Sequence, residues 1–262
     1  MFAEERQQRI AELVAVRSRV TVNELAELFT ITSETVRRDL ATLESARTLR
    51  RVHGGAVALD RLSTSEASLV ERQSQQQEQK ARIARAAAAM LPTTGAGSIL
   101  LDAGTSTALL ADELLDWSPA GPGDALLVVT NAVPIAHKLS ANAALQLEIL
   151  GGRVRGLTSA VVGPTATEQL AGLRPDIAFV GANGVHADFG LSTPDAMEAA
   201  AKHAMVTAAR RVVVLADSSK LGSEALVRFA RLSEIDALVT DAVPPADLSA
   251  ALAAANVEVV IA

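Results

Sequence analysis

"SETVRRDLATLES", residues 33–45, is the stretch that decides the fold of the N-terminal part of this chain. Its apolar residues recur at i, i+4 and i+7, which predicts a helix with one buried face. That face consists of Val36, Leu40 and Leu43. Arg37 and Arg38 are then left on the outer surface of the helix. Asp39 is expected to steady a neighbouring arginine.

The segments on either side of this helix complete a recognisable pattern. Residues 3–16 form an amphipathic helix, and "TVNE", residues 21–24, is a capping box that begins a second helix. A short helix, a tight turn and a further helix with an exposed basic start are typical of a helix-turn-helix. "LRRVHGGAVAL", residues 49–59, predicts two strands around a glycine pair, which form a wing. Residues 1–58 are therefore predicted to be a winged helix-turn-helix domain.

The charge of this segment points to nucleic acid. The whole chain has a net charge of −6, but residues 35–53 contain five arginines against one aspartate and one glutamate. Arginine suits bidentate contacts with phosphate or guanine, although codon usage in a GC-rich genome is an alternative reason for arginine over lysine. Ser33 is expected to cap the helix or contact a phosphate. The predicted contacts with double-stranded DNA are Ser33, Thr35, Arg37, Arg38, Arg51 and His53.

The composition limits the class of protein. The chain has 262 residues, no cysteine, 49% hydrophobic and only 2% aromatic residues, so its core must consist mainly of Ala, Val, Leu and Ile. The charged start lacks a signal peptide, and no apolar stretch reaches the length of a membrane span. We expect a cytoplasmic protein with no membrane partner. The four histidines lack metal-ligand spacing, so neither a metal nor a cofactor is expected.

The rest of the chain has a different pattern. Residues 59–80 are polar and rich in glutamine, and they are predicted to be a linker. From residue 81 to residue 262, apolar strand-like segments alternate with helical ones, which predicts a parallel sheet covered by helices on both faces. The fold class is therefore α/β. Ligands of such sheets bind where the strands end.

Five of the predicted strands end in residues that suit a phosphorylated, polyhydroxyl ligand. They carry glycines, small hydroxyls, amides or cations, and the first set opens a helix, whose N-terminus attracts anions. These segments are "DAGTST" (102–107), "TN" (130–131), "GGRVRG" (151–156), "GANGV" (181–185) and "DSSK" (217–220). Each segment by itself is also consistent with an ordinary cap or turn. Glu198 and Lys202 form either a surface ion pair of about 0.3–0.5 kcal/mol or part of the mouth of the site.

The motifs together resemble one family. "ITSETVRRDLATLESARTLRRVHGGA", residues 31–56, resembles the helix-turn-helix and wing signature of the DeoR-type bacterial repressors. "LLDAGTST", "VVTNAVPIA", "LGGRVRG", "FVGANGV" and "VVVLADSSKLG" resemble the effector domain of that family, in the same order. The resemblance implies a C-terminal domain similar to ribose-5-phosphate isomerase, a phosphorylated sugar that releases the protein from its operator, and a homodimer or homotetramer.

The resemblance also implies a set of effector contacts. They are Asp102, Gly104, Thr105, Ser106, Thr107, Thr130, Asn131, Gly151, Gly152, Arg155, Gly181, Asn183, Gly184, Glu198, Lys202 and Lys220. "MFAEERQQ" and "GGRVRG" look most like actinobacterial members associated with fructose uptake, which suggests fructose 1-phosphate as the effector. Two positions depart from the family pattern, because Thr30 and Arg47 stand where glycine or a similar turn former is usual.

An isomerase-like enzyme with an added N-terminal domain is the alternative. The isomerases that the C-terminal part resembles have acidic residues in a "DGADE" loop. Here the corresponding stretch is Gly181-Ala182-Asn183-Gly184, which lacks the carboxylates needed for proton transfer. Asp102 alone would have to serve as the base. The sequence therefore favours a regulator over an enzyme.

Overall fold

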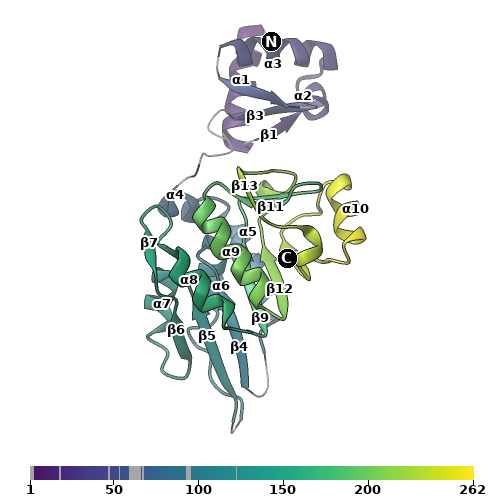
Figure 1. Cartoon of the computed structure of the whole chain (residues 1–262). Coiled ribbons are helices and arrows are strands. Elements are labelled where there is room, and N and C mark those ends of the chain that lie inside the picture. Colours follow the sequence, from purple (N-terminus) through teal and green to yellow (C-terminus); the bar gives the residue numbers. More distant parts are fainter. Residues whose placement is uncertain are drawn as a thin grey trace. The chain divides into compact units, whose positions relative to one another are not determined.

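The structure is a computed structural model that describes residues 3–17, 19–46, 48–52, 54–58, 66, 68–92, 96–121 and 123–262 (Figure 1). The chain divides into two compact units, Met1–Glu66 and Ala67–Ala262. Each unit has its own hydrophobic core, and we describe each by itself.

The first unit is a winged helix-turn-helix, as predicted. Its elements are α1 (Ala3–Arg17), β1 (Arg19–Thr21), α2 (Val22–Phe29), α3 (Ser33–Ser45), β2 (Leu49–Val52) and β3 (Gly55–Ala58). The strands form an antiparallel sheet in the order β1-β3-β2. The short strand β1 was not predicted. Its pairing requires glycine at position 55, where a Cβ atom would lie 2.0 Å from the carbonyl oxygen of Val20.

Asp39 belongs to the core of this unit rather than to its surface. Its carboxylate accepts hydrogen bonds from Arg6 Nε at 2.6 Å and from Gln7 Nε2 at 2.9 Å, both on α1. The arginine that it steadies is therefore not a neighbour on α3 but lies 33 positions earlier in the chain. This buried ion pair joins α1 to the same face of α3 that carries Val36 and Leu40.

The turn between α2 and α3 keeps its shape without glycine. Thr21 and Glu24 form the predicted capping box. Thr30 ends α2 in the left-handed conformation, with φ of 52°. The capping role expected of Ser33 falls to Thr32, whose hydroxyl accepts a hydrogen bond from the Thr35 amide at 3.2 Å. Arg47, the other departure from the family pattern, lies outside the described residues.

Replacing Thr30 with glycine is expected to stabilise the first unit by about 0.5–1 kcal/mol. A β-branched residue is strained at this φ, and the relief exceeds the added entropy of the unfolded chain. Hydrogen-exchange mass spectrometry of α2 and α3 peptides in the full chain measures the change. The control is Thr48→Gly, a loop position without positive φ, which is expected to give no stabilisation. Equal effects of the two changes would contradict the argument.

The second unit has the α/β fold that the alternating pattern predicts. Its helices are α4 (Leu69–Ser74), α5 (Gln77–Ala88), α6 (Thr105–Asp112), α7 (Val133–Leu139), α8 (Pro164–Ala171), α9 (Ala196–Ala208) and α10 (Ala246–Ala254), with 3-10 turns η1 (Ser218–Lys220) and η2 (Leu232–Glu234). Its strands are β4 (Ala96–Leu101), β5 (Ala125–Thr130), β6 (Gln146–Ile149), β7 (Arg153–Arg155), β8 (Ala160–Val162), β9 (Ile177–Gly181), β10 (Gly184–His186), β11 (Gly190–Thr193), β12 (Arg211–Leu215), β13 (Val227–Ala230), β14 (Ala237–Thr240) and β15 (Glu258–Ile261).

A seven-stranded parallel sheet is the centre of this unit, in the order β15-β14-β12-β9-β4-β5-β6 (Figure 1). Alternate residues of its strands face opposite sides, so Leu101 and Phe179 pack in one core with α5, α6 and α7, whereas Leu100 and Val180 pack in another with α8, α9 and α10. Two small antiparallel sheets, β10-β11-β13 and β7-β8, lie beside it.

The segment predicted as a linker is only partly a linker. Residues 68–80 are largely helical and belong to the second unit, whereas residues 59–65 lie outside the described residues. Ser68 and Glu71 form a capping box at the start of α4, and Lys80 and Ile83 of α5 are buried. The glutamine-rich composition concealed this short amphipathic structure, because only one side of α5 is apolar.

Candidate functional site

A pocket lies at the carboxyl ends of β4, β9 and β12, the three central strands of the sheet. It encloses about 510 Å³, part of it open to solvent. Four of its lining residues are cationic, and α4 and α5 contribute two of them. The pocket is lined by Arg72, Lys80, Ala103, Gly104, Thr105, Ser106, Gly181, Ala182, Asn183, Glu198, Lys202, Leu215, Ala216, Asp217 and Lys220.

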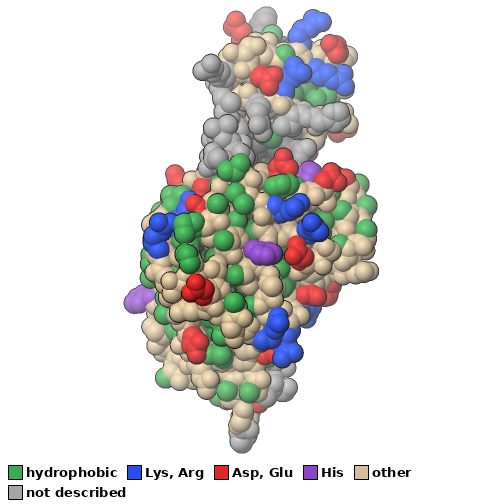
Figure 2. Space-filling view, in the orientation of Figure 1, with side chains coloured by type: hydrophobic (Ala, Val, Ile, Leu, Met, Phe, Trp, Pro, Cys, Tyr) green, Lys and Arg blue, Asp and Glu red, His purple; other side chains and the backbone are tan. Residues whose placement is uncertain are grey.

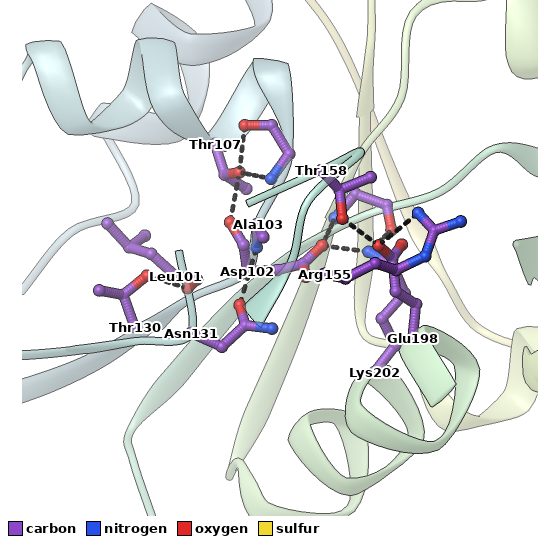
Figure 3. Close-up of polar contacts among 12 residues, drawn as sticks. Leu101, Asp102, Ala103, Thr107, Thr130, Asn131, Arg155, Thr158, Glu198 and Lys202 are labelled. Atoms are coloured by element: carbon purple, nitrogen blue, oxygen red, sulfur yellow. Dashed lines mark hydrogen bonds and ion pairs between the residues drawn. The ribbon is translucent and has the colours of Figure 1, made fainter. Parts of the chain in front are cut away.

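The start of α6 forms one wall of the pocket. Gly104 is the N-cap residue, and Thr105 and Ser106 open the first turn. Thr107 does not line the pocket. Its hydroxyl donates to the Asp102 carbonyl at 2.6 Å and accepts from the Gly104 amide at 3.0 Å, so it holds the loop before the helix (Figure 3). The wall therefore presents hydroxyls at a helix N-terminus, where partial positive charge favours anions.

A buried ion pair lies beneath this wall. Lys202 Nζ, on α9, donates to Asp102 Oδ2 and, at 2.9 Å, to the Gly181 carbonyl (Figure 3). Asp102 Oδ2 also accepts from the Gly181 amide at 3.0 Å. The exposed fractions are 1% for Asp102 and 4% for Lys202, so both charges depend on each other. The pair joins the ends of β4 and β9 to α9 and leaves Lys202 on the pocket wall.

Glu198 and Lys202 do not form the surface ion pair that was one of the two alternatives. Both side chains are 4% exposed, and each has a different partner. Glu198 accepts from the Thr158 hydroxyl and pairs with Arg155 at 3.2 Å (Figure 3). Arg155 also pairs with Asp195 at 3.3 Å, and it does not line the pocket. Arg155 therefore pairs with two carboxylates, one of which, that of Glu198, belongs to a lining residue.

The predicted residues at the end of β5 hold the loop after β4 from behind the pocket. The Thr130 hydroxyl donates to the Leu101 carbonyl at 2.7 Å. Asn131 Oδ1 accepts from the Ala103 amide at 2.9 Å, and its Nδ2 donates to the Val161 carbonyl at 3.0 Å. Both side chains are buried and their polar groups are used by the backbone (Figure 3). They shape the site without lining it.

Three predicted glycines also lie outside the pocket lining. The Gly151 amide donates to Gln169 Oε1 at 2.8 Å, and Gly152 has φ of 145°. Both follow β6, the terminal strand of the sheet, and β5 lies between β6 and the central strand β4. Gly184 lies in β10, where a Cβ atom would be 2.4 Å from the Ser223 carbonyl oxygen. Its need for glycine is a matter of packing.

Three charged lining residues, Arg72, Lys80 and Asp217, are not among the predicted effector contacts. The first two fell within the predicted linker, and Asp217 lies in the predicted segment "DSSK", of which only Lys220 was expected to touch the ligand. Burial lowers the pKa of Lys80 to about 8, opposed by the nearby Asp217 carboxylate and reinforced by Lys220 and Arg72. The position of Lys80 three residues before Ile83, on the apolar face of α5, was the feature of the sequence that could have indicated its burial. The pocket is thus more cationic than the sequence suggested.

In the first unit, α2, α3 and the wing enclose a groove. It encloses about 830 Å³, part of it open to solvent, and it is lined by Val22, Asn23, Arg37, Leu40, Arg51, Gly54 and Gly55. Arg37 and Arg38 are exposed, and Arg37 lies 3.6 Å from Glu34 in a loose ion pair. Figure 2 shows basic side chains exposed on this unit. Such cations suit the phosphates and base edges of DNA.

Two of the remaining predicted DNA contacts, Arg51 and Thr35, already have partners within the protein. The Arg51 amide donates to Glu44 Oε1 at 2.8 Å, and its guanidinium lies 3.7 Å from the same carboxylate, so α3 positions the wing. The Thr35 hydroxyl shares a hydrogen bond of 2.9 Å with Thr32. His53 lies outside the described residues. Arg37 and Arg38 are therefore the best placed of the predicted contacts.

Comparison with known families settles the class of protein. Residues 75–242 match the model of the DeoR C-terminal sensor domain, and residues 6–62 match the DeoR-like helix-turn-helix domain. The chain belongs to the DeoR family. The relatives that match this chain are transcriptional regulators and not enzymes. This DeoR-family chain is therefore a DNA-binding regulator.

Two relatives span nearly the whole of this DeoR-family chain. The HTH-type transcriptional regulator GlpR of Haloferax volcanii is 35% identical and aligns over 99% of this chain and 98% of its own length. The glycerol-3-phosphate regulon repressor of Escherichia coli is 31% identical over 92% of each chain. Among solved structures, ribose 5-phosphate isomerase from Plasmodium falciparum is 14% identical, with 54% of this chain and 52% of that chain covered and a TM-score of 0.37.

No group of three or more histidine, aspartate or glutamate side chains among the described residues is arranged to hold a metal ion. Among the same residues, no helix combines the length and apolar content of a membrane span.

Proposed function

We propose that this regulator represses a sugar uptake or catabolism operon and that a phosphorylated sugar, bound in the pocket at the end of the central strands, releases it from its operator. The observation that carries the proposal is the charge of the pocket. Arg72, Lys80, Lys202 and Lys220 surround the hydroxyl-rich start of α6, which is an arrangement for a phosphate. Asn183 and Glu198 supply polar groups for sugar hydroxyls.

The proposed effector contacts are narrower than the set that the family resemblance implies. The lining residues Gly104, Thr105, Ser106, Gly181, Asn183, Glu198, Lys202 and Lys220 are proposed to touch the ligand. Asp102 and Arg155 are proposed to position Lys202 and Glu198. Fructose 1-phosphate is the first candidate effector because of the resemblance to fructose-operon members. The E. coli relative is by name a regulon repressor for a phosphorylated compound, glycerol 3-phosphate, which supports the ligand class.

The assembly is proposed to be a homodimer or homotetramer in the cytoplasm, where operator DNA and sugar phosphates meet. The two edge strands of the large sheet support self-association. Ile149 at the end of β6 is 50% exposed and Ile261 of β15 is 48% exposed. A second copy covering either edge would remove apolar surface from water.

A sugar-phosphate screen tests the proposed function. Saturating fructose 1-phosphate, at 100 times its dissociation constant, is expected to stabilise the second unit by about 2.7 kcal/mol. Operator DNA selected from a random pool is expected to bind roughly 5- to 150-fold more weakly in its presence, as is typical of allosteric coupling. Thermal denaturation and gel shift measure the two effects. Fructose without phosphate is the control.

Absence of a thermal shift with every sugar phosphate tried would refute the ligand class. A shift without a change in operator binding would refute the regulatory coupling while retaining the pocket. Tighter binding to the operator would reverse the proposed direction of control.

A further inference from the structure

We infer that Lys80 binds the phosphate of the effector and at the same time holds the end of α4, so that effector binding stabilises the first helix that follows the DNA-binding unit in the chain. This rests on the proposed function, since it assigns a residue and a mode of regulation to the same pocket. Lys80 lies in the segment that composition alone marks as a linker.

The position of the Lys80 ammonium group carries the inference. The residue is only 4% exposed, and it lines the pocket together with Lys202 and Lys220. Its Nζ donates to the carbonyl of Arg72 at 2.5 Å and to the carbonyl of Gln75 at 2.7 Å. Lys80 thus lines a cationic pocket while its ammonium group binds the carbonyls at the end of α4.

The chemistry of an ammonium group allows both contacts at once. It has three N–H donors, and two of them are used by the carbonyls of Arg72 and Gln75. Among the contacts of the described residues, the third donor has no partner, so it is available to a phosphate oxygen. Lysine is a common phosphate ligand of this point-charge kind.

The turn that Lys80 holds, between α4 and α5, has no side-chain cap at the start of α5. Gln76, in this turn, is in the left-handed conformation with φ of 52°. α4 has only six residues and no buried side chain. A phosphate that keeps Lys80 charged and in place would therefore stabilise α4 and this turn, since the carbonyls that Lys80 binds belong to them.

The state of Lys80 makes this contact sensitive to a bound anion. Its pKa is lowered to about 8 because burial disfavours the charge, while Asp217 raises it and Lys220 and Arg72 lower it. Glu198 and Lys202 of α9 line the same pocket. A phosphate dianion raises this pKa, so its binding favours the protonated form that donates to both carbonyls.

Hydrogen-exchange mass spectrometry of the full chain with fructose 1-phosphate tests the inference. The wild-type protein is expected to gain protection both at residues 102–107 and at residues 68–76. Lys80→Met is expected to bind roughly 10- to 150-fold more weakly, because a charged hydrogen bond is lost. At a saturating concentration it should regain protection at 102–107 and not at 68–76.

Two matched variants separate this role from general effects. Asn183→Ala removes a lining side chain outside α4 and α5, and it should weaken binding while both segments still gain protection at saturation. Arg85→Met removes an exposed cation of α5 outside the pocket and should behave as wild type. Protection of 68–76 in saturated Lys80→Met, or protection of 102–107 alone in the wild-type protein, would overturn the inference.

A measurement on the wild-type protein keeps the test decisive if Lys80→Met does not fold. Affinity for fructose 1-phosphate should fall by about twofold from pH 7 to pH 8 and then by up to about tenfold per pH unit, as Lys80 loses its proton in the free protein. Constant affinity up to pH 9.5 would contradict the role of Lys80. No protection anywhere with any sugar phosphate would instead reject the proposed function, and this inference with it.

Discussion

Replacing Arg37 or Arg38 with alanine is expected to weaken operator binding roughly 5- to 150-fold for each change, equivalent to about 1–3 kcal/mol. Both side chains are exposed at the start of α3, and neither contributes to the core of the first unit. Arg37 gives up only a loose ion pair with Glu34, at 3.6 Å between two exposed groups, so folding should be unaffected. Gel shifts with selected operator DNA measure the loss.

The salt dependence of binding assigns each arginine to a base or to a phosphate. Loss of a phosphate contact weakens binding to all sequences and lowers the slope of log affinity against log salt by about one. Loss of a base contact relaxes sequence preference at one position. Arg9→Ala is the matched control, because Arg9 is an exposed arginine of α1 in the same unit. Unchanged affinity in both α3 variants, or an equal loss in Arg9→Ala, would refute the recognition surface.

Lys202→Met is expected to destabilise the second unit by about 3–5 kcal/mol. The substitution leaves the Asp102 carboxylate buried without its cation, and it also removes the donor to the Gly181 carbonyl. Those two contacts join β4, β9 and α9 beneath the pocket. Urea denaturation of the full chain, with an unchanged m-value for the transition of this unit, measures the loss of stability.

A pair on the surface is the appropriate comparison. Lys138 lies 2.5 Å from Asp112, and both side chains are at least one-third exposed, so Lys138→Met should cost at most about 1 kcal/mol. The double change Asp102→Leu with Lys202→Met removes both buried charges and should recover part of the stability lost in Lys202→Met, while effector binding stays lost. Similar losses in the Lys138 and Lys202 variants would contradict the importance of burial.

Local sequence patterns predicted the first unit and the sheet because these patterns depend on residues that are close together in the sequence. The capping box of Thr21 and Glu24 and the spacing of Val36 and Leu40 depend on residues three or four apart, and the structure has them as predicted. The partner of Asp39 could not be predicted in this way. Arg6 lies 33 positions away, and only the packing of α1 on α3 brings the two charges together.

The residues of the candidate pocket were likewise predictable only in part. Residues that follow the central strands, such as Gly104 and Asn183, could be placed at its wall from the alternating pattern, since parallel strands end at one edge of the sheet. Strand order could not be read from the sequence. It puts β6 at the edge, and Gly151 and Gly152 with it, away from the pocket lining.

By itself, the sequence determined the class of each unit, the family and the exposed basic start of α3, because these depend on local periodicity and on contiguous motifs. Tertiary structure alone decided which polar groups meet. It buried Lys202 against Asp102, turned Thr130 and Asn131 toward the backbone, and brought Lys80 from the supposed linker to the pocket wall. The physical reason is that burial and pairing of a charge depend on neighbours distant in the chain, which no local pattern records.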